Sequence, residues 1–326
     1  MLSSLMRCLL IVLPLLWLSS PARATGTVRL AIQKTGTVAW ELAVIRTHGL
    51  DKRADLNIAV TELASPEAGK IALRGGSADV IIADWLWVSR ERQLGTKLVF
   101  YPYSSALGAV MVPASSSIRT FDDLKGRKLA VAGGAIDKNW ILLQAAMKLD
   151  GIDIKSEANV VFGAPPLLAA KTASGEMDAA LNYWNFSAAL EAKGFRRIGG
   201  IENILPKLGA KGPTAMIGYV FNERWADKNR DLIARYIAVT RQAKEILATS
   251  DEEWEKIAPI TAAPDRATLR TYRDRYREGI PRRSIAEEQE DARVLYKVLA
   301  ETGGTDLVGP ARELDPGTFY RAIPGS

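Results

Sequence analysis

The chain from Arg119 to Asp150 has the sequence RTFDDLKGRKLAVAGGAIDKNWILLQAAMKLD. Lys128 to Ala132 is a short β-prone run, and the pair Gly133-Gly134 lets the backbone turn tightly after it. Asp137 is placed to N-cap a helix whose apolar residues share one face. We therefore predict a strand, a glycine loop and a helix, with free backbone N–H groups beside the loop that can bind a small polar or anionic ligand.

A second segment earlier in the chain has the same pattern, with equivalent residues separated by 99 positions. The order of strand, loop, helix, proline-started helix, glycine, aspartate and tryptophan recurs, which indicates an internal repeat. We predict two lobes of similar βαβ topology. The matching residues are Pro66 with Pro165, Gly76 with Gly175, Asp79 with Asp178, Trp85 with Trp184, and Leu30-Ala31-Ile32 with Leu129-Ala130-Val131.

Ligands of parallel βαβ units bind beyond the carboxyl ends of the strands. In the first lobe these ends are followed by Gln33 to Thr37 and by Asp84-Trp85, and in the second by Gly133 to Asn139 and by Asn182 to Phe186. If the two lobes face each other, these loops line one cleft between them. Five aromatic residues are expected at this cleft: Trp40, Trp85, Trp140, Tyr183 and Trp184.

The amino end predicts a secretory signal peptide over residues 1–24. Arg7 precedes an apolar run from Cys8 to Leu18, and Ala22-Arg23-Ala24 is an A-x-A cleavage site, so the mature chain is expected to begin at Thr25. Cys8 is the only cysteine, so a mature chain would contain no disulfide and no thiol nucleophile. We expect a soluble secreted protein.

Charge and motif content exclude several function classes. The formal charge of +6 falls to +4 once Arg7 and Arg23 are removed, which does not favour nucleic-acid binding. No metal-ligand spacing and no phosphate-binding loop is present, so no metal and no cofactor is expected. The arginines between Arg270 and Arg283 and the acids between Glu287 and Asp291 are predicted to lie on solvated helix faces. His48, the only histidine, is expected to stabilise a helix carboxyl end.

Several short motifs in this order resemble the periplasmic solute-binding proteins of ABC importers, in the branch that serves nitrate, sulfonates, taurine and thiamine-pyrimidine precursors. The motifs are a ligand loop at Gln33 to Trp40, Gly-x-x-Asp at Gly76 to Asp79 and again at Gly175 to Asp178, DLKG with a strand and glycine loop at Asp123 to Gly134, and Phe221 to Ala226. The resemblance implies an α/β fold of type II, a two-lobed clamp of mostly parallel sheets flanked by helices.

The resemblance also implies a domain organisation and partners. The first lobe would comprise residues 25–112 and 221–326, with the C-terminal helices packed on it, and the second lobe residues 113–220. Such proteins are periplasmic monomers that close over a small organic ligand and dock on an ABC permease in the inner membrane. The hinges would lie near Val112-Pro113 and at Gly218 to Asn222.

The resemblance also implies that the ligand contacts lie in the predicted loops of the two lobes. Two acids, Asp84 and Asp137, lie in the predicted loops, no arginine does, and the only lysines are Lys34 and Lys138. A neutral, zwitterionic or cationic organic ligand with a flat part is therefore expected rather than a small inorganic anion. The candidate ligand-binding residues are Gln33, Thr37, Trp40, Asp84, Trp85, Gly133, Gly134, Asp137, Asn139, Trp184 and Asn185.

Three alternatives remain open at this stage. Trp85 and Trp184 can each belong to a lobe core or to a cleft wall. The same clamp hosts some enzymes, including fungal pyrimidine-precursor synthases, although their cysteine-rich motif is absent here and no catalytic residues are predicted. A sensory protein that reports a ligand to a membrane receptor would have the same sequence features as a transport protein.

Overall fold

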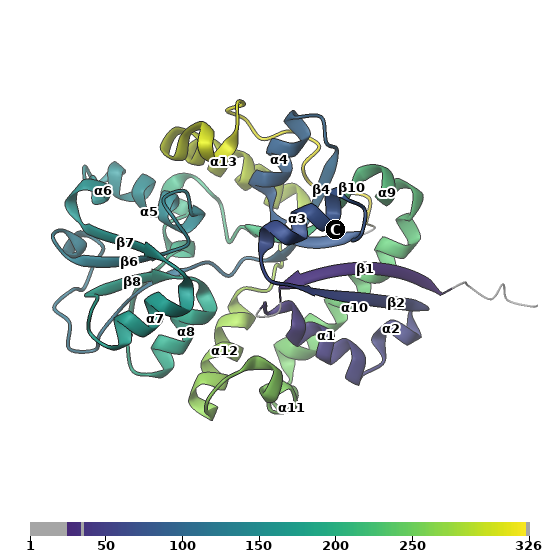
Figure 1. Ribbon diagram of the computed structural model, residues 1–326, viewed down its shortest axis with the longest axis horizontal. Helices are drawn as coiled ribbons and strands as arrows, with labels where there is room; N and C mark the ends of the chain where they lie inside the picture. Colours follow the sequence, from purple (N-terminus) through teal and green to yellow (C-terminus); the bar gives the residue numbers. More distant parts are fainter. Residues whose placement is uncertain (1–24, 34–35, 324–326) are drawn as a thin grey trace, which may run out of the picture.

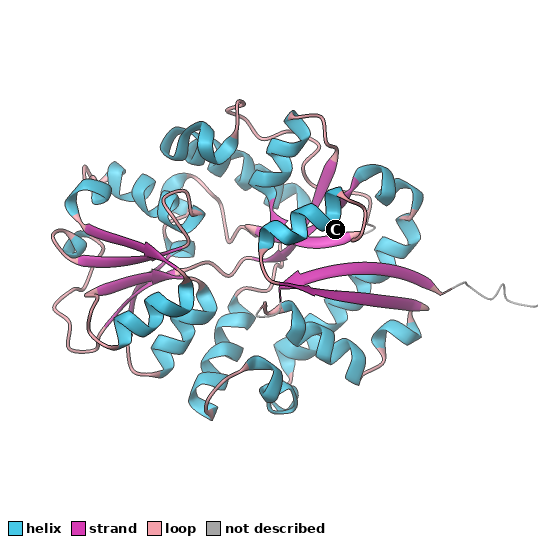
Figure 2. Ribbon diagram, viewed as in Figure 1, coloured by secondary structure: helices cyan, strands magenta, loops and turns pink. Residues whose placement is uncertain are grey.

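Two five-stranded sheets, each flanked by helices, form the two halves of the protein (Figure 1). The computed structural model describes residues 25–33 and 36–323. The predicted signal peptide, with Cys8, and the candidate loop residue Lys34 lie outside the described residues. We call the half built on the first sheet the first lobe and the half built on the second sheet the second lobe; Figure 2 shows the strands of each sheet as separate magenta layers.

The first sheet has the strand order β2-β1-β3-β10-β4. Strands β2, β1 and β3 run parallel to one another, whereas β10 runs antiparallel to both β3 and β4. The bounds are β1 Gly26–Gln33, β2 Leu56–Leu63, β3 Val80–Asp84, β4 Leu98–Ser104 and β10 Ile217–Asn222.

The second sheet has the order β7-β6-β8-β5-β9, which is the same pattern. Strands β7, β6 and β8 are parallel, and β5 runs antiparallel to β8 and β9 as β10 does in the first sheet. The bounds are β5 Ala109–Val112, β6 Lys128–Ala132, β7 Asn159–Gly163, β8 Ala179–Asn182 and β9 Arg196–Gly200.

Helices cover both sheets, and the last five follow the return of the chain to the first lobe. Those of the first lobe are α1 Val38–Thr47, α2 Leu50–Arg53, α3 Pro66–Arg74 and α4 Trp85–Gln93. Those of the second are α5 Lys138–Leu149, α6 Ile154–Glu157, α7 Pro165–Ala173 and α8 Trp184–Ala192. The C-terminal helices are α9 Glu223–Lys228, α10 Arg230–Thr249, α11 Asp251–Thr261, α12 Arg266–Glu278 and α13 Ile285–Val308.

The predicted repeat is confirmed, and its two aspartates make equivalent hydrogen bonds. Helices α7 and α8 begin 99 positions after α3 and α4. In the first lobe Asp79 accepts a hydrogen bond from the Arg29 N–H (2.9 Å), and its own N–H donates to the Arg29 carbonyl (2.8 Å). Asp178 makes the same two bonds with Lys128 (2.7 and 3.0 Å). Each aspartate therefore ties a helix-to-strand turn to the neighbouring parallel strand.

Two of the predicted lobe boundaries differ from the structure. Strand β5 pairs with β8 and β9, so the chain enters the second sheet before Ala109 rather than after Val112. Strand β10 lies wholly in the first sheet, so the chain returns before Ile217 rather than at residue 221. The turn residues around Pro113 mark the end of β5, and an apolar run as short as Ala109–Val112 carries no signal of which sheet it joins.

The C-terminal helices do not pack on the first lobe alone. Helix α10 packs on α1 and β1, and α11 packs on α1, as the prediction for a covering layer requires. Helix α12, however, packs against α8, and α13 packs against both α4 and α5, so each reaches the second lobe. The two lobes are thus joined by these helices as well as by the two chain crossings.

Candidate functional site

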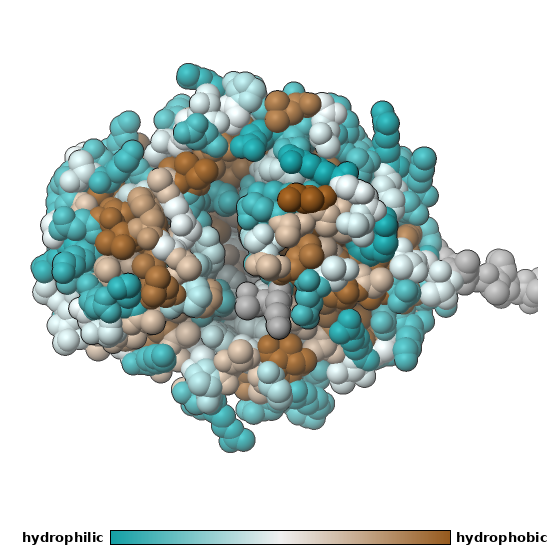
Figure 3. Space-filling view, in the orientation of Figure 1, coloured by the Kyte–Doolittle hydropathy of each residue, from teal (hydrophilic) through white to brown (hydrophobic). Residues whose placement is uncertain are grey.

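The candidate site is a recess between the two lobes, visible in the space-filling view (Figure 3). Because β1, β3, β6 and β8 all end toward this region, the residues that follow them come together from opposite sheets (Figure 1). Hydrogen bonds, an ion pair and a ring contact join the two walls. The predicted meeting of the loops across a cleft is therefore what the structure shows.

An ion pair joins the two lobes inside the recess. The Lys138 ammonium, at the start of α5, lies 3.1 Å from Oδ2 of Asp84, which ends β3. The other oxygen of Asp84 accepts the Trp87 N–H (2.8 Å) and so caps α4. Burial by itself would raise the pKa of Asp84, but the Lys138 charge and the Trp87 N–H bring that pKa below its ordinary value.

The glycine loop of the second lobe holds Asp137 in a polar network. Oδ1 of Asp137 accepts the backbone N–H of Asn139 (2.9 Å), which confirms the predicted N-cap of α5, and Oδ2 accepts the Tyr183 hydroxyl (3.2 Å). Gly133 has φ +90°, and a Cβ there would lie 2.9 Å from the Tyr183 oxygen, so a side chain would disrupt the network. Burial raises the pKa of Asp137. Asn139 also accepts the N–H of Gly108, which anchors the first crossing.

A pair of tryptophans makes the aromatic contact between the lobes. The rings of Trp40, on α1, and Trp184, which begins α8, meet edge to face with centroids 5.8 Å apart. Tyr272 stacks on Trp40 (5.5 Å), and Tyr276 lies 6.5 Å from Trp184. Trp184 is half-buried whereas Trp40 is 5% exposed, so Trp184 is the more accessible ring of the two.

Trp85 is not at the cleft, although it is the repeat partner of Trp184. It is 0% exposed, its Nε1 donates to the Ala215 carbonyl (3.0 Å), and its ring packs on Tyr296 of α13. The predicted cleft-wall role of Trp85 is therefore wrong, because α13 packs on α4 and its Tyr296 covers the Trp85 ring. Trp140, also predicted at the cleft, is 1% exposed and belongs to the core of the second lobe.

The remaining predicted residues lie at the end of a strand, in the loop after it or in the first turn of the next helix, with intermediate exposure. Thr37 precedes α1, and its hydroxyl lies 3.1 Å from that of Tyr103. Whether these residues contact a ligand stays a prediction. The residues of this group are Gln33, Thr37, Gly134 and Asn185.

A buried ion pair beneath the recess was not foreseen. Glu41, 1% exposed, is bonded to the Lys244 ammonium and accepts hydroxyl hydrogen bonds from Tyr276 (2.6 Å) and Tyr219 (3.3 Å). Burial lowers the pKa of Lys244 although the Glu41 charge opposes this. The pair ties α1 to α10 and α12. Its sequence signal was present, since Glu41 is the one charged residue in the apolar run Val38–Ile45.

Two acids of α13 hold the second crossing between the lobes. Glu288 accepts the N–H of Ala215 (2.8 Å), and Asp291 accepts those of Lys211 (2.9 Å) and Gly212 (3.1 Å). Both acids are 1% exposed, so the predicted solvated face is wrong for them. Burial raises the pKa of Glu288 to about 7.

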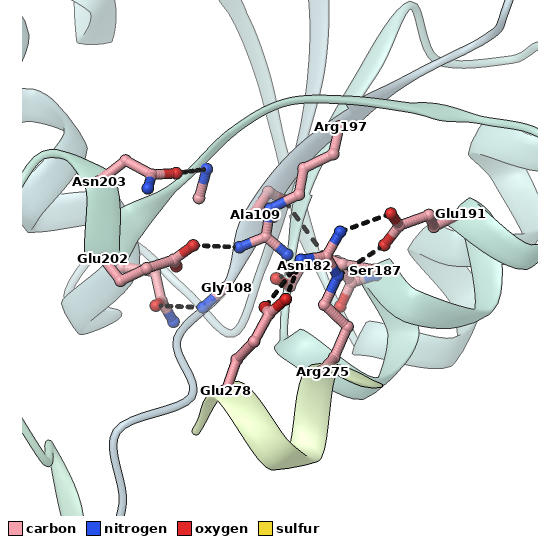
Figure 4. Close-up of polar contacts among 12 residues, drawn as sticks. Gly108, Ala109, Asn182, Ser187, Glu191, Arg197, Glu202, Asn203, Arg275 and Glu278 are labelled. Atoms are coloured by element: carbon pink, nitrogen blue, oxygen red, sulfur yellow. Dashed lines mark hydrogen bonds and ion pairs between the residues drawn. The ribbon is translucent and has the colours of Figure 1, made fainter. Parts of the chain in front are cut away.

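One arginine of α12 makes a further ion pair between the lobes (Figure 4). The Arg275 guanidinium donates to both carboxylate oxygens of Glu191 on α8 (2.9 and 2.6 Å) and also contacts Glu278 on its own helix. This bidentate geometry is the strong form of such a pair. The prediction of a purely solvated arginine face therefore fails at Arg275, because α12 packs on α8.

The surroundings of the only histidine and the grouping of possible metal ligands bear on the enzyme and metal alternatives. His48 follows α1, and its Nε2 lies 3.0 Å from the Glu253 carboxylate on α11, in agreement with a structural role. Across residues 25–33 and 36–323, no group of three or more His, Cys, Asp or Glu side chains could hold a metal ion. No helix within the same residues is long and apolar enough to cross a membrane.

Two α/β lobes that face each other across a recess define the class of two-lobed α/β clamp folds. Residues 42–253 match the model of the NMT1/THI5-like family, which is more than half of the chain, and the protein belongs to that family. No curated protein sequence matches the chain.

Several solved structures share the fold. The alkanesulfonate-binding protein SsuA of Xanthomonas axonopodis pv. citri, bound to MOPS, is 20% identical with a TM-score of 0.66, over 91% of this chain and 99% of that one. The periplasmic aliphatic sulphonate binding protein SsuA of Escherichia coli is 21% identical with a TM-score of 0.68, over 88% and 94%. The desulfurization enzyme DSZB is 14% identical with a TM-score of 0.56, over 89% and 97%. At these identities the likeness establishes the fold.

Proposed function

We propose that this protein is a periplasmic solute-binding protein, which captures a small organic solute in the recess between its lobes and delivers it to an ABC-type permease. The observation that carries the proposal is that residues following the strands of both sheets meet across one recess, where Asp84 pairs with Lys138 and Trp40 meets Trp184. A ligand held there touches both lobes, and its binding energy can then favour one arrangement of the lobes over another.

The structural comparisons, the predicted signal peptide and the position of the histidine support this proposal. Proteins of the same fold include sulfonate-binding components from two bacteria. The predicted signal peptide would place the mature chain in the periplasm, where it would act as a monomer. Capture is favoured over catalysis because the only histidine, His48, is engaged with Glu253 at the far end of α1 from the recess.

Binding of small molecules to the purified mature chain tests the proposal. We would screen sulfonates, pyrimidines, amines and aromatic acids by thermal shift and confirm stoichiometry by native mass spectrometry. A ligand at a hundredfold excess over its Kd stabilises the folded state by about 2.7 kcal/mol, which is readily seen as a higher Tm. A one-to-one complex with at least one class is expected. A folded protein that binds none of the classes, or one that converts a bound compound into a product, would contradict the proposed function.

A further inference from the structure

Charges of both signs are gathered at the recess. Lys138, from the second lobe, faces Asp84 at 3.1 Å and is also influenced by the charges of Asp137 and Glu67. Lys70, on α3 of the first lobe, lies near Asp84 and pairs with Glu67 at 3.7 Å. Among the described residues, the carboxylates of Asp84, Asp137 and Glu67 and the ammonium groups of Lys138 and Lys70 therefore lie near one another where the lobes meet.

A ligand with a charge of one sign fits this arrangement poorly. An anion would be attracted by Lys138 but repelled by the surrounding carboxylates, and it would draw Lys138 away from Asp84. A cation would pair with Asp84 but leave Lys138 without that partner. Leaving one member of a partly buried ion pair without its partner costs free energy. A ligand with a single charge therefore loses part of the binding energy that its own ion pair provides.

The two members of the pair are positioned independently of each other. One oxygen of Asp84 is held by the Trp87 N–H, which leaves Oδ2 to pair with Lys138 of the other lobe. Lys138 is the first residue of α5, whose N-cap is fixed by the Asn139 and Tyr183 contacts of Asp137. Each lobe therefore presents one charge on a rigid helix start, and a ligand between them meets two preformed partners of opposite sign.

We propose that Asp84 and Lys138 determine ligand specificity, and that the recess selects a zwitterion whose protonated amine pairs with Asp84 and whose acid group pairs with Lys138. This inference rests on the proposed solute-binding function and names its substrate class. Tyr183, whose hydroxyl bonds to Asp137 next to Lys138 in the chain, and the following Trp184 are both half-buried, and their rings offer a surface for a flat or aliphatic spacer.

Two matched sets of compounds, measured by isothermal titration calorimetry, test this inference. The first set is MOPS at a mildly acidic pH, where its ring nitrogen is protonated, with propanesulfonate and N-propylmorpholine. The second is aminomethylbenzoate with benzoate and benzylamine. In the set that binds, we expect the zwitterion to bind at least tenfold more tightly than either singly charged relative, because two charge-assisted contacts replace one.

Three variants assign the contacts. Asp84→Asn keeps the helix cap and removes the charge, so it should abolish the advantage of the zwitterion over the plain acid. Lys138→Met should abolish its advantage over the plain amine. Lys148→Met, an exposed position near the other end of α5, is the matched control and should leave all affinities unchanged.

The possible results separate this inference from the proposed function. A plain anion or amine that binds as tightly as its zwitterion, or a zwitterion preference that survives both Asp84→Asn and Lys138→Met, would overturn the inference and leave solute binding intact. If neither set binds, the compounds that bind in the wider screen are compared by charge. The inference is then overturned if no zwitterion is among the tightest binders. No hit of any class would instead contradict the solute-binding function itself.

Discussion

Replacing Glu288 by glutamine should change how the stability of the protein depends on pH. Glu288 is buried where α13 meets the second crossing and accepts the Ala215 N–H, and burial raises its pKa from an ordinary 4.5 to about 7. A raised pKa in the folded state means that the folded protein holds this proton more tightly than the unfolded chain does. The associated stability is fully present below pH 4.5 and is lost as the pH rises through 7.

The magnitude follows from the size of this shift. Each pKa unit corresponds to about 1.4 kcal/mol, so ionised Glu288 lowers the free energy of unfolding by roughly 3 kcal/mol above pH 7 relative to its protonated form. Glutamine cannot ionise, and its carbonyl oxygen can still accept the Ala215 N–H. Glu288→Gln should therefore be close to wild type in acid and gain up to roughly 3 kcal/mol over it as the pH rises past neutrality.

Urea unfolding of the wild type and the variant at a series of pH values gives this difference directly. Glu290→Gln is the matched control, because Glu290 is an exposed residue of the same helix that pairs with Arg293, and it should alter stability by only a few tenths of a kcal/mol. A difference between wild type and Glu288→Gln that stays constant between acid and alkaline pH would refute the reasoning.

Three further outcomes are expected. Lys244→Met leaves Glu41 as an unpaired buried charge and should lower the free energy of unfolding by about 3–5 kcal/mol in chemical denaturation. A double variant that also carries Glu41→Gln should recover part of that loss, and no recovery would argue against the pair. Trp85→Ala should lower the free energy of unfolding by about 3–5 kcal/mol, whereas Trp184→Ala should weaken ligand binding by about 1–3 kcal/mol. Equal effects of the two variants on ligand binding would contradict the different placement of these tryptophans. Asp178→Ala should lower stability by about 0.5–1.5 kcal/mol in the same denaturation assay, since it removes the acceptor of the exposed Lys128 N–H, and an unchanged midpoint would count against this role.

The sequence predicted the fold well because the repeat fixes local features twice. Proline at a helix start and glycine at its end each act within a few residues. The repeated aspartate marks the following turn, although the hydrogen bonds of Asp79 and Asp178 reach a strand fifty residues earlier. The N-cap at Asp137 was predictable for the same reason. It depends only on Asp137 and the helix that follows it.

What could not be predicted depends on contacts between distant parts of the chain. The repeat equates Trp85 with Trp184, yet α13 buries the first and leaves the second at the recess. Glu288 and Asp291 have the spacing of a solvated helix face, but they accept backbone N–H groups from a crossing more than seventy residues earlier. The partner of Asp84 was likewise unforeseen, because Lys138 belongs to the other lobe.

The central claim is that the two lobes close on a small solute. Cysteines introduced at Thr61 in the first lobe and Lys155 in the second, both exposed, would carry spin labels for a pulsed electron–electron distance measurement in the mature chain. A control pair at Lys155 and Lys193 lies within the second lobe. With a saturating ligand from the screen, the distance between lobes should shift to shorter values and narrow while the control distance stays constant. An unchanged distance between lobes, with binding confirmed by calorimetry on the same sample, would contradict the account.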